Sequence, residues 1–473
     1  MGDFIMRFIQ FNAYFFIFFA LVYTSFLFSS VVYGFWSLIK QQRLKNLGIT
    51  LKHAYFFPVS IIVPAYNEEV TIISTIQSLL RLDYHQYEII VVDDGSADET
   101  SQNAIDKYQL KQVKRPVRLR LKSQKIMGIY EGYVQGVKVV LIQKENGGKG
   151  DALNAGINVS QFPYFVTIDA DSMLQKDALK AVMQPVLRDD TTIAVGGLIR
   201  ISQTAKMEDG MPTAITLPKN PIISIQAVEY ERSFLASRIL LNRFNNNLII
   251  SGAFGLFKKT AVVEVGGYNT ETLGEDMDLV MRMILHFTKK KEKFRMAYEP
   301  SAVCWTQVPH RFSDLRKQRR RWYLGLYQSL AKYREIGLGV KRGTTFLFSY
   351  YFYLFFELLA PFIELMGLLN IILCLYLGLL NATYMIRLYL LYLLFSIIVT
   401  ITAFILRVFV QNTPLKIQDV GRAIAVTIME TFAYRYILSW VRVTSFRGYR
   451  KKKDEWGKIE RTVEENDNSS NTK

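Results

Sequence analysis

The chain has 473 residues, of which half are hydrophobic and 14% are aromatic. This length exceeds one average domain and the hydrophobic share is high for a soluble enzyme, so we expect a membrane part. The net charge is +17, and the apolar runs together with the lack of a recognisable nucleic-acid-binding motif favour an anionic membrane surface and a phosphorylated substrate, and no nucleic acid. Two distant cysteines without zinc-type spacing indicate neither a disulfide framework nor a metal cluster.

The first apolar run extends from about Phe8 to Ile39 and is long enough to span a bilayer. It is too long for a signal-peptide core, and no small-residue cleavage site follows it. Lys40, Arg43 and Lys45 come directly after it, so the positive-inside rule places the next segment in the cytoplasm. We therefore predict an N-terminal transmembrane helix over residues 1–45. A buried core helix is the alternative that the length disfavours.

Short β-rich runs alternate with helical segments over residues 55–300, which we assign to one cytosolic domain. The run from Ser60 to Val63 predicts a strand, Thr71 to Leu80 a helix, and Glu88 to Val92 a second strand. A strand, helix, strand order is typical of a parallel sheet covered by helices. The predicted fold class is therefore α/β.

Asp169 and Asp171 follow the apolar run from Tyr164 to Ile168, so we expect both carboxylates at the exit of a buried strand, where open α/β sheets bind ligands. Two aspartates one residue apart can share a divalent cation, and Mg²⁺ or Mn²⁺ takes one or two protein carboxylates plus phosphate oxygens. Such a metal stabilises the charge on a leaving diphosphate. A turn or a helix cap is the alternative for any Asp-x-Asp pair.

A glycine-rich segment, Glu145 to Gly150, opens a helix predicted from Asp151 to Ile157. Glycines let the backbone approach a ligand, a helix N-terminus favours phosphate, and Lys149 adds a positive charge. Surface turns have the same composition. The weight of this motif comes from its position between two predicted strands that end in aspartates.

Two further polar motifs lie about forty residues apart, Gly274-Glu275-Asp276 and Gln318 to Trp322. The acidic pair can raise a carboxyl pKa toward the range of a general base, although a helix N-terminus with acids in its first turn has the same pattern. An amide, a charge and a large flat face, supplied by Gln318, Arg321 and Trp322, can hold a diphosphate and stack a sugar. An amphipathic basic helix on a membrane is the other interpretation.

The C-terminal third predicts amphipathic interfacial helices over residues 301–343, and transmembrane and interfacial helices over residues 344–446. The runs from Thr344 to Leu380 and from Leu388 to Val410 have spanning length, unless Pro361 splits the first of them.

The run from Ala423 to Val443 carries three charges that are expensive at mid-bilayer. A further crossing there would also place the basic segment that begins at Arg447 outside the cell, against the positive-inside rule. We therefore predict an interfacial or re-entrant helix, followed by a basic and then disordered cytosolic tail over residues 447–473.

In order and spacing, the motifs from Val63 to Trp322, with their flanking apolar segments, resemble the processive, membrane-embedded family-2 glycosyltransferases, the group of cellulose, hyaluronan, chitin and poly-N-acetylglucosamine synthases. The resemblance implies a cytosolic GT-A domain with a Rossmann-like mixed sheet, and C-terminal helices that form a channel in a multi-pass protein of the cell membrane. It also implies an inverting hexosyltransferase that polymerises UDP-glucose or UDP-N-acetylglucosamine into a β-linked polysaccharide and translocates it across the plasma membrane.

The partners implied by this resemblance are the UDP-sugar donor, the growing polysaccharide acceptor and the lipid bilayer, with Mg²⁺ or Mn²⁺ as the cofactor. Whether an accessory subunit completes the export path stays open. The resemblance assigns uridine contacts to Pro64, Tyr66, Glu68 and Asp94, and a position near the nucleotide to Lys149. It assigns binding of the metal and diphosphate to Asp169 and Asp171, and deprotonation of the acceptor to Asp276 beside Glu275. Binding of the acceptor end and the pyrophosphate falls to Gln318, Arg321 and Trp322.

Two departures leave the identity of the sugar open: Gly274 stands where many family members have threonine, and Arg319-Arg320 is more basic than usual. One rival function is a non-processive transferase that adds a single sugar to a lipid acceptor. The Gln-x-x-Arg-Trp motif followed by several apolar spans argues against it. Another rival is a membrane scaffold with an inactive sugar-binding domain, and the presence of every expected catalytic carboxylate argues against that.

Overall fold

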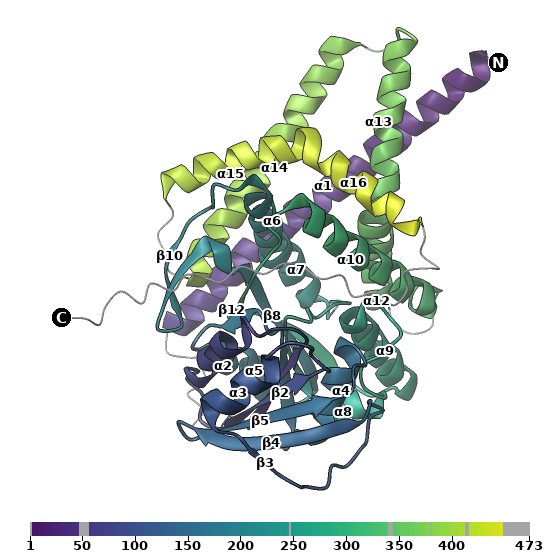
Figure 1. The fold of residues 1–473 in the computed structure, drawn as a ribbon. Helices are drawn as coiled ribbons and strands as arrows, with labels where there is room; N and C mark the ends of the chain where they lie inside the picture. Colours follow the sequence, from purple (N-terminus) through teal and green to yellow (C-terminus); the bar gives the residue numbers. More distant parts are fainter. Residues whose placement is uncertain are drawn as a thin grey trace.

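The structure, a computed structural model, describes residues 2–46, 56–245, 247–338, 344–379, 381–411 and 416–447. An α/β part lies at the bottom of Figure 1, and helices rise from it toward the top. Of the predicted tail, residues 448–473 lie outside the described residues.

Ten strands form one mixed sheet in the order β3-β4-β5-β2-β1-β6-β11-β8-β12-β7. The pairs β5/β2, β2/β1, β1/β6 and β8/β12 are parallel, and the other neighbours are antiparallel. This confirms the predicted Rossmann-like mixed sheet. The strands are β1 Val59–Ala65, β2 Tyr87–Asp93, β3 Lys111–Gln112, β4 Ile126–Val134, β5 Val137–Lys144, β6 Tyr164–Ile168, β7 Ser172–Leu174, β8 Thr192–Ile201, β11 Phe254–Lys258 and β12 Arg295–Thr306; a separate hairpin contains β9 Ala205–Glu208 and β10 Met211–Ile215.

The central strands β1, β2 and β6 are rich in apolar residues and buried along almost their whole length, because both faces of the sheet are covered by helices. One face packs against α2 (Ile72–Leu80), α3 (Thr100–Tyr108) and α5 (Ala178–Arg188), which contribute to one apolar core. The opposite face packs against a second core from α4 (Lys149–Val159), α8 (Lys259–Glu264) and α9 (Glu275–Lys290). The sheet is thus the middle layer of three, and the carboxyl ends of its parallel strands stay accessible to ligands.

The domain boundary predicted between residues 300 and 301 is wrong, because it falls inside β12. This strand pairs with β8 on one side and β7 on the other, so the sheet continues to Thr306. The interfacial segment therefore starts later than predicted, with α10.

The remaining helices lie above the sheet. In chain order they are α1 Gly2–Asn46, α6 Pro221–Arg232, α7 Arg238–Arg243, α10 Phe312–Lys332, α11 Glu335–Leu338, α12 Thr344–Phe352, α13 Ala360–Tyr376, α14 Ala382–Gln411, α15 Ile417–Met429 and α16 Arg435–Val443; the π-helical turns are η2 Ser233–Ser237, η3 Tyr353–Leu358 and η4 Glu430–Tyr434, and the 3₁₀ turns are η1 Ser202–Thr204 and η5 Thr444–Phe446.

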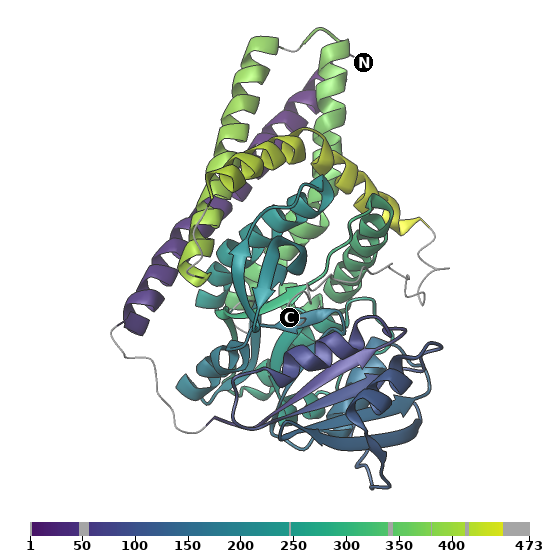
Figure 2. The same ribbon diagram turned by 60° about the vertical axis from the view of Figure 1, so that its left-hand side comes forward.

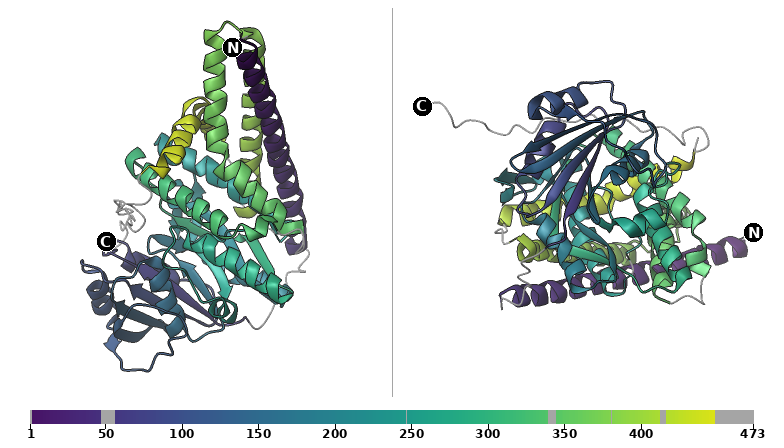
Figure 3. Two further views of the ribbon diagram at one scale, coloured as in Figure 1. Left: turned by 90° about the vertical axis from the view of Figure 1, so that its right-hand side faces the viewer. Right: turned by 90° about the horizontal axis from the view of Figure 1, so that it is seen from below.

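Two helices of the described chain are long and apolar enough to cross a membrane, over Met6–Lys40 and Met385–Arg407. A third candidate is the pair Phe346–Leu358 and Ala360–Tyr376, which bends by 44° where the two meet. The predicted run from Thr344 to Leu380 is therefore broken, and Pro361 lies in the first turn of α13, where a missing N–H costs little. Figures 2 and 3 show α1, α13 and α14 rising together from the α/β part.

The predicted interfacial helix is α15, η4 and α16. These elements lie across the rising helices in Figure 1, directly above the α/β part. They are not among the candidate spans found in the described residues. Their position relative to a bilayer stays a prediction.

Candidate functional site

A cavity of about 1370 Å³ lies between one edge of the sheet and the helices above it. Its upper wall comes from α1, α6, α10, α13, α14, α16 and the three π-helical turns. All of the predicted site residues line this single cavity: Pro64, Tyr66, Glu68, Asp94, Lys149, Asp169, Asp171, Glu275, Asp276, Gln318, Arg321 and Trp322.

The lower wall is built by four neighbouring parallel strands, β5, β2, β1 and β6. Their carboxyl ends meet at one edge, where open α/β sheets bind ligands. Tyr66 and Glu68 follow β1, Asp94 follows β2, Lys149 follows β5 and Asp169 follows β6. Residues that are about a hundred positions apart in sequence thus come together because their strands are adjacent.

The Asp94 carboxylate holds the glycine-rich turn. It accepts the backbone N–H groups of Gly147 at 3.0 Å and Gly148 at 2.7 Å and forms an ion pair with Lys144. Burial raises the pKa of Asp94, against the opposing effects of Lys144 and the two N–H groups. Gly148 has a φ of 85°, a left-handed conformation that favours glycine. The side chain predicted to contact uridine therefore also shapes the glycine-rich turn.

Lys144 is a residue that the sequence interpretation missed. It is the last residue of β5, is buried, and bridges Asp94 and Asp151, the latter at 2.8 Å. A lysine at the end of a buried strand is the signal that could have identified it, since buried lysines need a charged partner.

Lys149 lies between two of the predicted acidic groups. Its Nζ is 2.5 Å from Asp169 Oδ1 and 3.7 Å from Glu275 Oε1. Burial opposes the charge on Lys149, but the carboxylates of Asp169 and Glu275 outweigh it and raise the pKa of the amine. The positively charged Lys149 amine is therefore held between the carboxyl end of β6 and the start of α9.

Asp169 and Asp171 flank buried Ala170, and both side chains are partly exposed to the cavity. Within the described chain, no cluster of three or more histidine, cysteine, aspartate or glutamate side chains forms a ready metal cage. Two carboxylates at a strand exit nevertheless suit Mg²⁺ or Mn²⁺, which usually keep water or take phosphate oxygens as the remaining ligands.

Glu275 and Asp276 begin α9, so the acidic pair and the helix N-terminus, two interpretations of one pattern, are both present. Asp276 Oδ2 accepts the N–H of Gly252 at 3.1 Å, and Oδ1 accepts the N–H of Met277 at 2.8 Å. Burial and the neighbouring Asp276 raise the pKa of Glu275, whereas Lys149 acts in the opposite direction. The Asp276 carboxylate is thus fixed in one orientation on the cavity wall.

A contact between two glycines joins α9 to α10. A Cβ placed on Gly325 would lie 2.9 Å from the backbone N of Gly274, which is closer than real Cβ atoms come. Gln328, one turn further along α10, accepts the N–H of Leu273 at 2.9 Å through Oε1. Gly274, a departure from the family pattern, therefore lets the acidic motif approach α10 closely.

Gln318, Arg321 and Trp322 lie on α10 and line the cavity beside this contact. Trp322 is 40% exposed, so its ring is available to a ligand. Gln318 Oε1 is buried and has no hydrogen-bond partner in the described chain. The amide oxygen can accept a hydrogen bond from a ligand, and the open aromatic face can stack on a flat or ring-shaped group.

Arg319, which the sequence analysis identified only as part of a departure from the family pattern, lines the same cavity. Its guanidinium forms two hydrogen bonds with Glu229 of α6, both of 2.7 Å, and stacks over the Trp322 ring at 4.9 Å. Burial disfavours its charge, but Glu229 outweighs this and keeps the pKa of Arg319 above its usual value. Arg319 thus packs on one face of the Trp322 ring and helps to hold its orientation.

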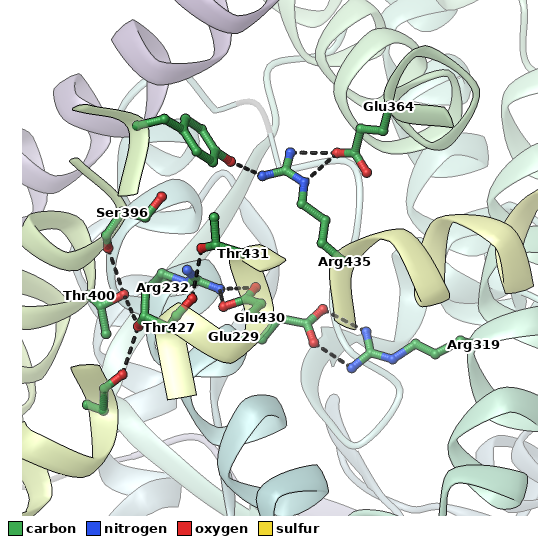
Figure 4. Close-up of polar contacts among 12 residues, drawn as sticks. Glu229, Arg232, Arg319, Glu364, Ser396, Thr400, Thr427, Glu430, Thr431 and Arg435 are labelled. Atoms are coloured by element: carbon green, nitrogen blue, oxygen red, sulfur yellow. Dashed lines mark hydrogen bonds and ion pairs between the residues drawn. The ribbon is translucent and has the colours of Figure 1, made fainter. Parts of the chain in front are cut away.

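Further ion pairs continue up the helical wall, as Figure 4 shows. Arg232 of α6 binds both oxygens of Glu430 at 2.5 and 2.7 Å. Arg435 of α16 binds Glu364 of α13 at 2.5 Å, and Ser439 donates to the same carboxylate at 2.6 Å. These pairs satisfy two of the three charges that made the run from Ala423 to Val443 unsuitable as a membrane span.

Comparisons with known proteins agree with this geometry. Residues 60–266 match the family model for glycosyl transferase family 2, and residues 164–410 match that for glycosyl transferase family group 2. The chain is 30% identical over 277 residues to the poly-beta-1,6-N-acetyl-D-glucosamine synthase of Staphylococcus aureus strain COL, a match that covers 58% of this chain and 56% of that protein. It is 28% identical over 291 residues to the synthase of the same name from Staphylococcus epidermidis, with 61% and 59% covered. The chain therefore matches somewhat more than half the length of these relatives.

Among solved structures, the mannosyltransferase PcManGT from Pyrobaculum calidifontis, in complex with GDP-Man and Mn²⁺, is similar with a TM-score of 0.52 at 17% identity. The similarity covers 87% of this chain and 99% of that one, and at this identity it shows the fold alone. Because the second family model spans more than half of the 473 residues, the chain belongs to the family-2 glycosyltransferases.

Proposed function

We propose that this chain is a processive, inverting hexosyltransferase that extends a β-linked polysaccharide from a UDP-sugar and passes the product across the plasma membrane. The observation that carries the proposal is the single cavity, which joins the strand-end residues, Asp276, the α10 motif and the membrane helices. Donor, base and acceptor can then meet in one continuous cavity, so each added sugar lengthens a chain that already lies among the helices.

N-acetylglucosamine is the sugar that we favour, with glucose as the second choice. The relatives at 28 and 30% identity are named poly-beta-1,6-N-acetyl-D-glucosamine synthases. Their matches reach only part of their length, so donor and linkage are proposals for this chain.

In the proposed reaction the nucleotide lies along the strand ends. Pro64, Tyr66 and Glu68 face the uridine from β1, and the turn held by Asp94 approaches the phosphates through its backbone N–H groups. Lys149 supplies a positive charge to the diphosphate once it exchanges its contact with Asp169 for phosphate oxygens.

Asp276 removes the proton from the acceptor hydroxyl, because its two backbone hydrogen bonds aim it into the cavity. The hydroxyl oxygen then attacks the anomeric carbon from the face opposite the diphosphate, and the bond to phosphate breaks with its electron pair. A single displacement of this kind inverts the anomeric centre. Trp322 holds the acceptor ring by stacking, and Gln318 and Arg321 hold its end beside the diphosphate.

Asp169 and Asp171 are the residues that would hold Mg²⁺ or Mn²⁺. A bound metal supplies Lewis-acid stabilisation of the charge on the departing diphosphate. The membrane placement follows the candidate spans: a multi-pass protein of the cell membrane, with the sheet in the cytosol and the bilayer around α1, α13 and α14. An accessory subunit for export is compatible with this arrangement.

The test uses the full chain in nanodiscs with Mg²⁺ or Mn²⁺, and records UDP release and product size for UDP-N-acetylglucosamine and UDP-glucose in parallel. We expect UDP release and long polymer from the first donor. Long polymer from UDP-glucose alone would replace the sugar. A product with one sugar on a lipid would replace the proposal by the non-processive function, and absence of UDP release from both donors would contradict it.

A further inference from the structure

The helical half of the cavity contains one glutamate that takes part in none of the described ion pairs. Four glutamates of the helices line it, and three of them are paired: Glu229 with Arg319, Glu430 with Arg232, and Glu364 with Arg435. Glu357 of η3 forms no hydrogen bond or ion pair with any residue that the structure describes. Its carboxylate oxygens are not sealed inside protein, since neither is among the buried unsatisfied atoms.

A guanidinium faces Glu357 across the same space. Arg442 of α16 lines the cavity and is the largest favourable charge acting on Glu357, yet the two do not approach closely enough to form an ion pair. The other charged groups that face Glu357 are Arg319, Arg238 and Glu229. Within the described chain the Arg442 guanidinium also has no hydrogen bond of its own. Two oppositely charged side chains of the cavity wall are therefore left without an ion pair among the described residues.

A third uncommitted polar group lies in the same wall. The Tyr434 hydroxyl of η4 is buried, lines the cavity and has no hydrogen-bond partner among the described residues. Its charged neighbours include Glu229, Arg319 and Arg442, so it lies in the same cluster. Buried polar groups are normally satisfied, and unsatisfied ones in a cavity need a ligand or water.

The local backbone supports a binding role. The three π-helical turns of the described chain, η2, η3 and η4, all line this cavity, and Glu357 and Tyr434 lie on two of them. Such turns are rare in proteins, and those that occur often lie at functional sites. Tyr353, one turn before Glu357, lines the same cavity as Asp276, so this wall and the proposed base share one space.

We propose that Glu357, Arg442 and Tyr434 form a binding subsite for a neutral pyranose of the growing glycan, next to the ring stacked on Trp322. Sugar hydroxyls fit this set because each both donates and accepts: one donates to the carboxylate, another accepts from the guanidinium, and the phenol completes the contact. The subsite rests on the proposed function and adds three acceptor-positioning residues to it.

The test measures binding of a short β-linked N-acetylglucosamine oligosaccharide to the full chain in nanodiscs, by calorimetry or by tryptophan fluorescence. Wild type, Glu357→Leu, Glu357→Gln, Arg442→Leu and Tyr434→Phe are compared, and Glu208→Gln on the exposed β9 hairpin is the matched control. We expect Glu357→Leu and Arg442→Leu to raise the Kd of the oligosaccharide about tenfold or more, since charge-assisted hydrogen bonds are lost. Glu357→Gln and Tyr434→Phe should raise it less, and UDP affinity should stay unchanged in all variants.

An unchanged oligosaccharide Kd in Glu357→Leu and Arg442→Leu, or no oligosaccharide binding by wild type, would overturn the subsite. These results differ from failure of the proposed function, which is the absence of UDP release by wild type. Loss of UDP affinity together with oligosaccharide affinity would mean that the variants are misfolded, and Glu357→Gln with intact UDP binding then decides by the same Kd criterion.

Discussion

The two halves of the cavity are built on different principles. One half, where we propose that the nucleotide binds and which we call the nucleotide half, lies at the carboxyl ends of the parallel strands. Each strand end contributes a short polar segment there, and the side chains bind mainly backbone N–H groups and neighbouring charges. The helical half is made of side chains that pair with each other across helices, as in Glu229 with Arg319 and Arg232 with Glu430. The first half is positioned by the strand ends and their local contacts, and the second by ion pairs between different helices.

We propose that this difference separates the two tasks of the cavity, with the reaction in the nucleotide half and binding of the glycan in the helical half. A site at parallel strand ends keeps its geometry while the strands remain paired, which suits a reaction that needs fixed distances. A wall of ion pairs with a few uncommitted groups offers donors and acceptors along its length, which suits a polymer that must move by one sugar at a time. Single substitutions can therefore disturb one half while sparing the other.

The largest effect is expected for Asp276→Asn. Because the amide cannot take the acceptor proton, kcat should fall by about 10²- to 10⁴-fold. UDP affinity should stay within a factor of two of wild type, since the nucleotide contacts lie on the strand ends. Steady-state UDP release and UDP titration test this, with exposed Asp106→Asn as the control. Polymerisation at the wild-type rate by Asp276→Asn would remove this residue from the role of base.

Glu229→Gln tests the helical half. It leaves Arg319 buried without its charged partner, and breaking a buried pair in this way costs about 3 kcal/mol of stability. Thermal unfolding in detergent measures the loss. As a control, Glu208→Gln breaks the exposed Lys206–Glu208 pair and should change stability by less than about 1 kcal/mol. Equal melting temperatures of wild type and Glu229→Gln would show that the pair does not support the helical wall.

The same pair predicts a pH dependence. Burial opposes the charge on Glu229, but Arg319 and its neighbours outweigh it and hold the pKa of the carboxyl below its ordinary value. The stabilisation is therefore complete above the ordinary pKa of about 4.3 and disappears as the pH falls through the lower pKa of the folded state. The difference in melting temperature between wild type and Glu229→Gln should shrink on acidification below about pH 4. A difference that grows on acidification would contradict the assignment.

Gly325→Ala tests the contact that joins the halves, and we expect the smallest of these effects. The new Cβ would press on Gly274 and shift α10 away from Asp276 by a few tenths of an ångström, so turnover should fall about tenfold. UDP affinity should not change. Gly421→Ala, whose Cβ would meet no atom within 4 Å, is the matched control. Full activity of Gly325→Ala would show that α9 and α10 do not need this close approach.

The nucleotide half could be predicted from sequence because its signals are local. A strand that ends in Asp169-Ala170-Asp171, or a glycine-rich turn before a helix, can be identified within ten residues, and adjacency of the strands then brings the signals together. The helical half could not be predicted in this way. The charges of Glu430 and Arg435 looked only expensive, since their partners Arg232 and Glu364 are 198 and 71 residues away in sequence.

Two features of the fold were not specified by the sequence, for similar reasons. The boundary predicted after residue 300 cut β12, because a long strand that changes register after Glu299 looks interrupted in sequence. The run from Thr344 to Leu380 has the composition of one span, but composition does not show where a helix bends. The roles of Lys144 and Arg319 were missed because each depends on a partner that is distant in sequence, and the sequence alone does not show which residues pair.

The most direct test of the central claim, that one cavity both adds sugars and keeps hold of the product, is a pulse and chase. Full-length chain in nanodiscs receives labelled UDP-N-acetylglucosamine for less than the time of a few turnovers, then a large excess of unlabelled donor, and the size of labelled product is followed. We expect the label to move steadily into long polymer, because each chain stays bound between additions. Label that remains in short, released or lipid-linked product would contradict it.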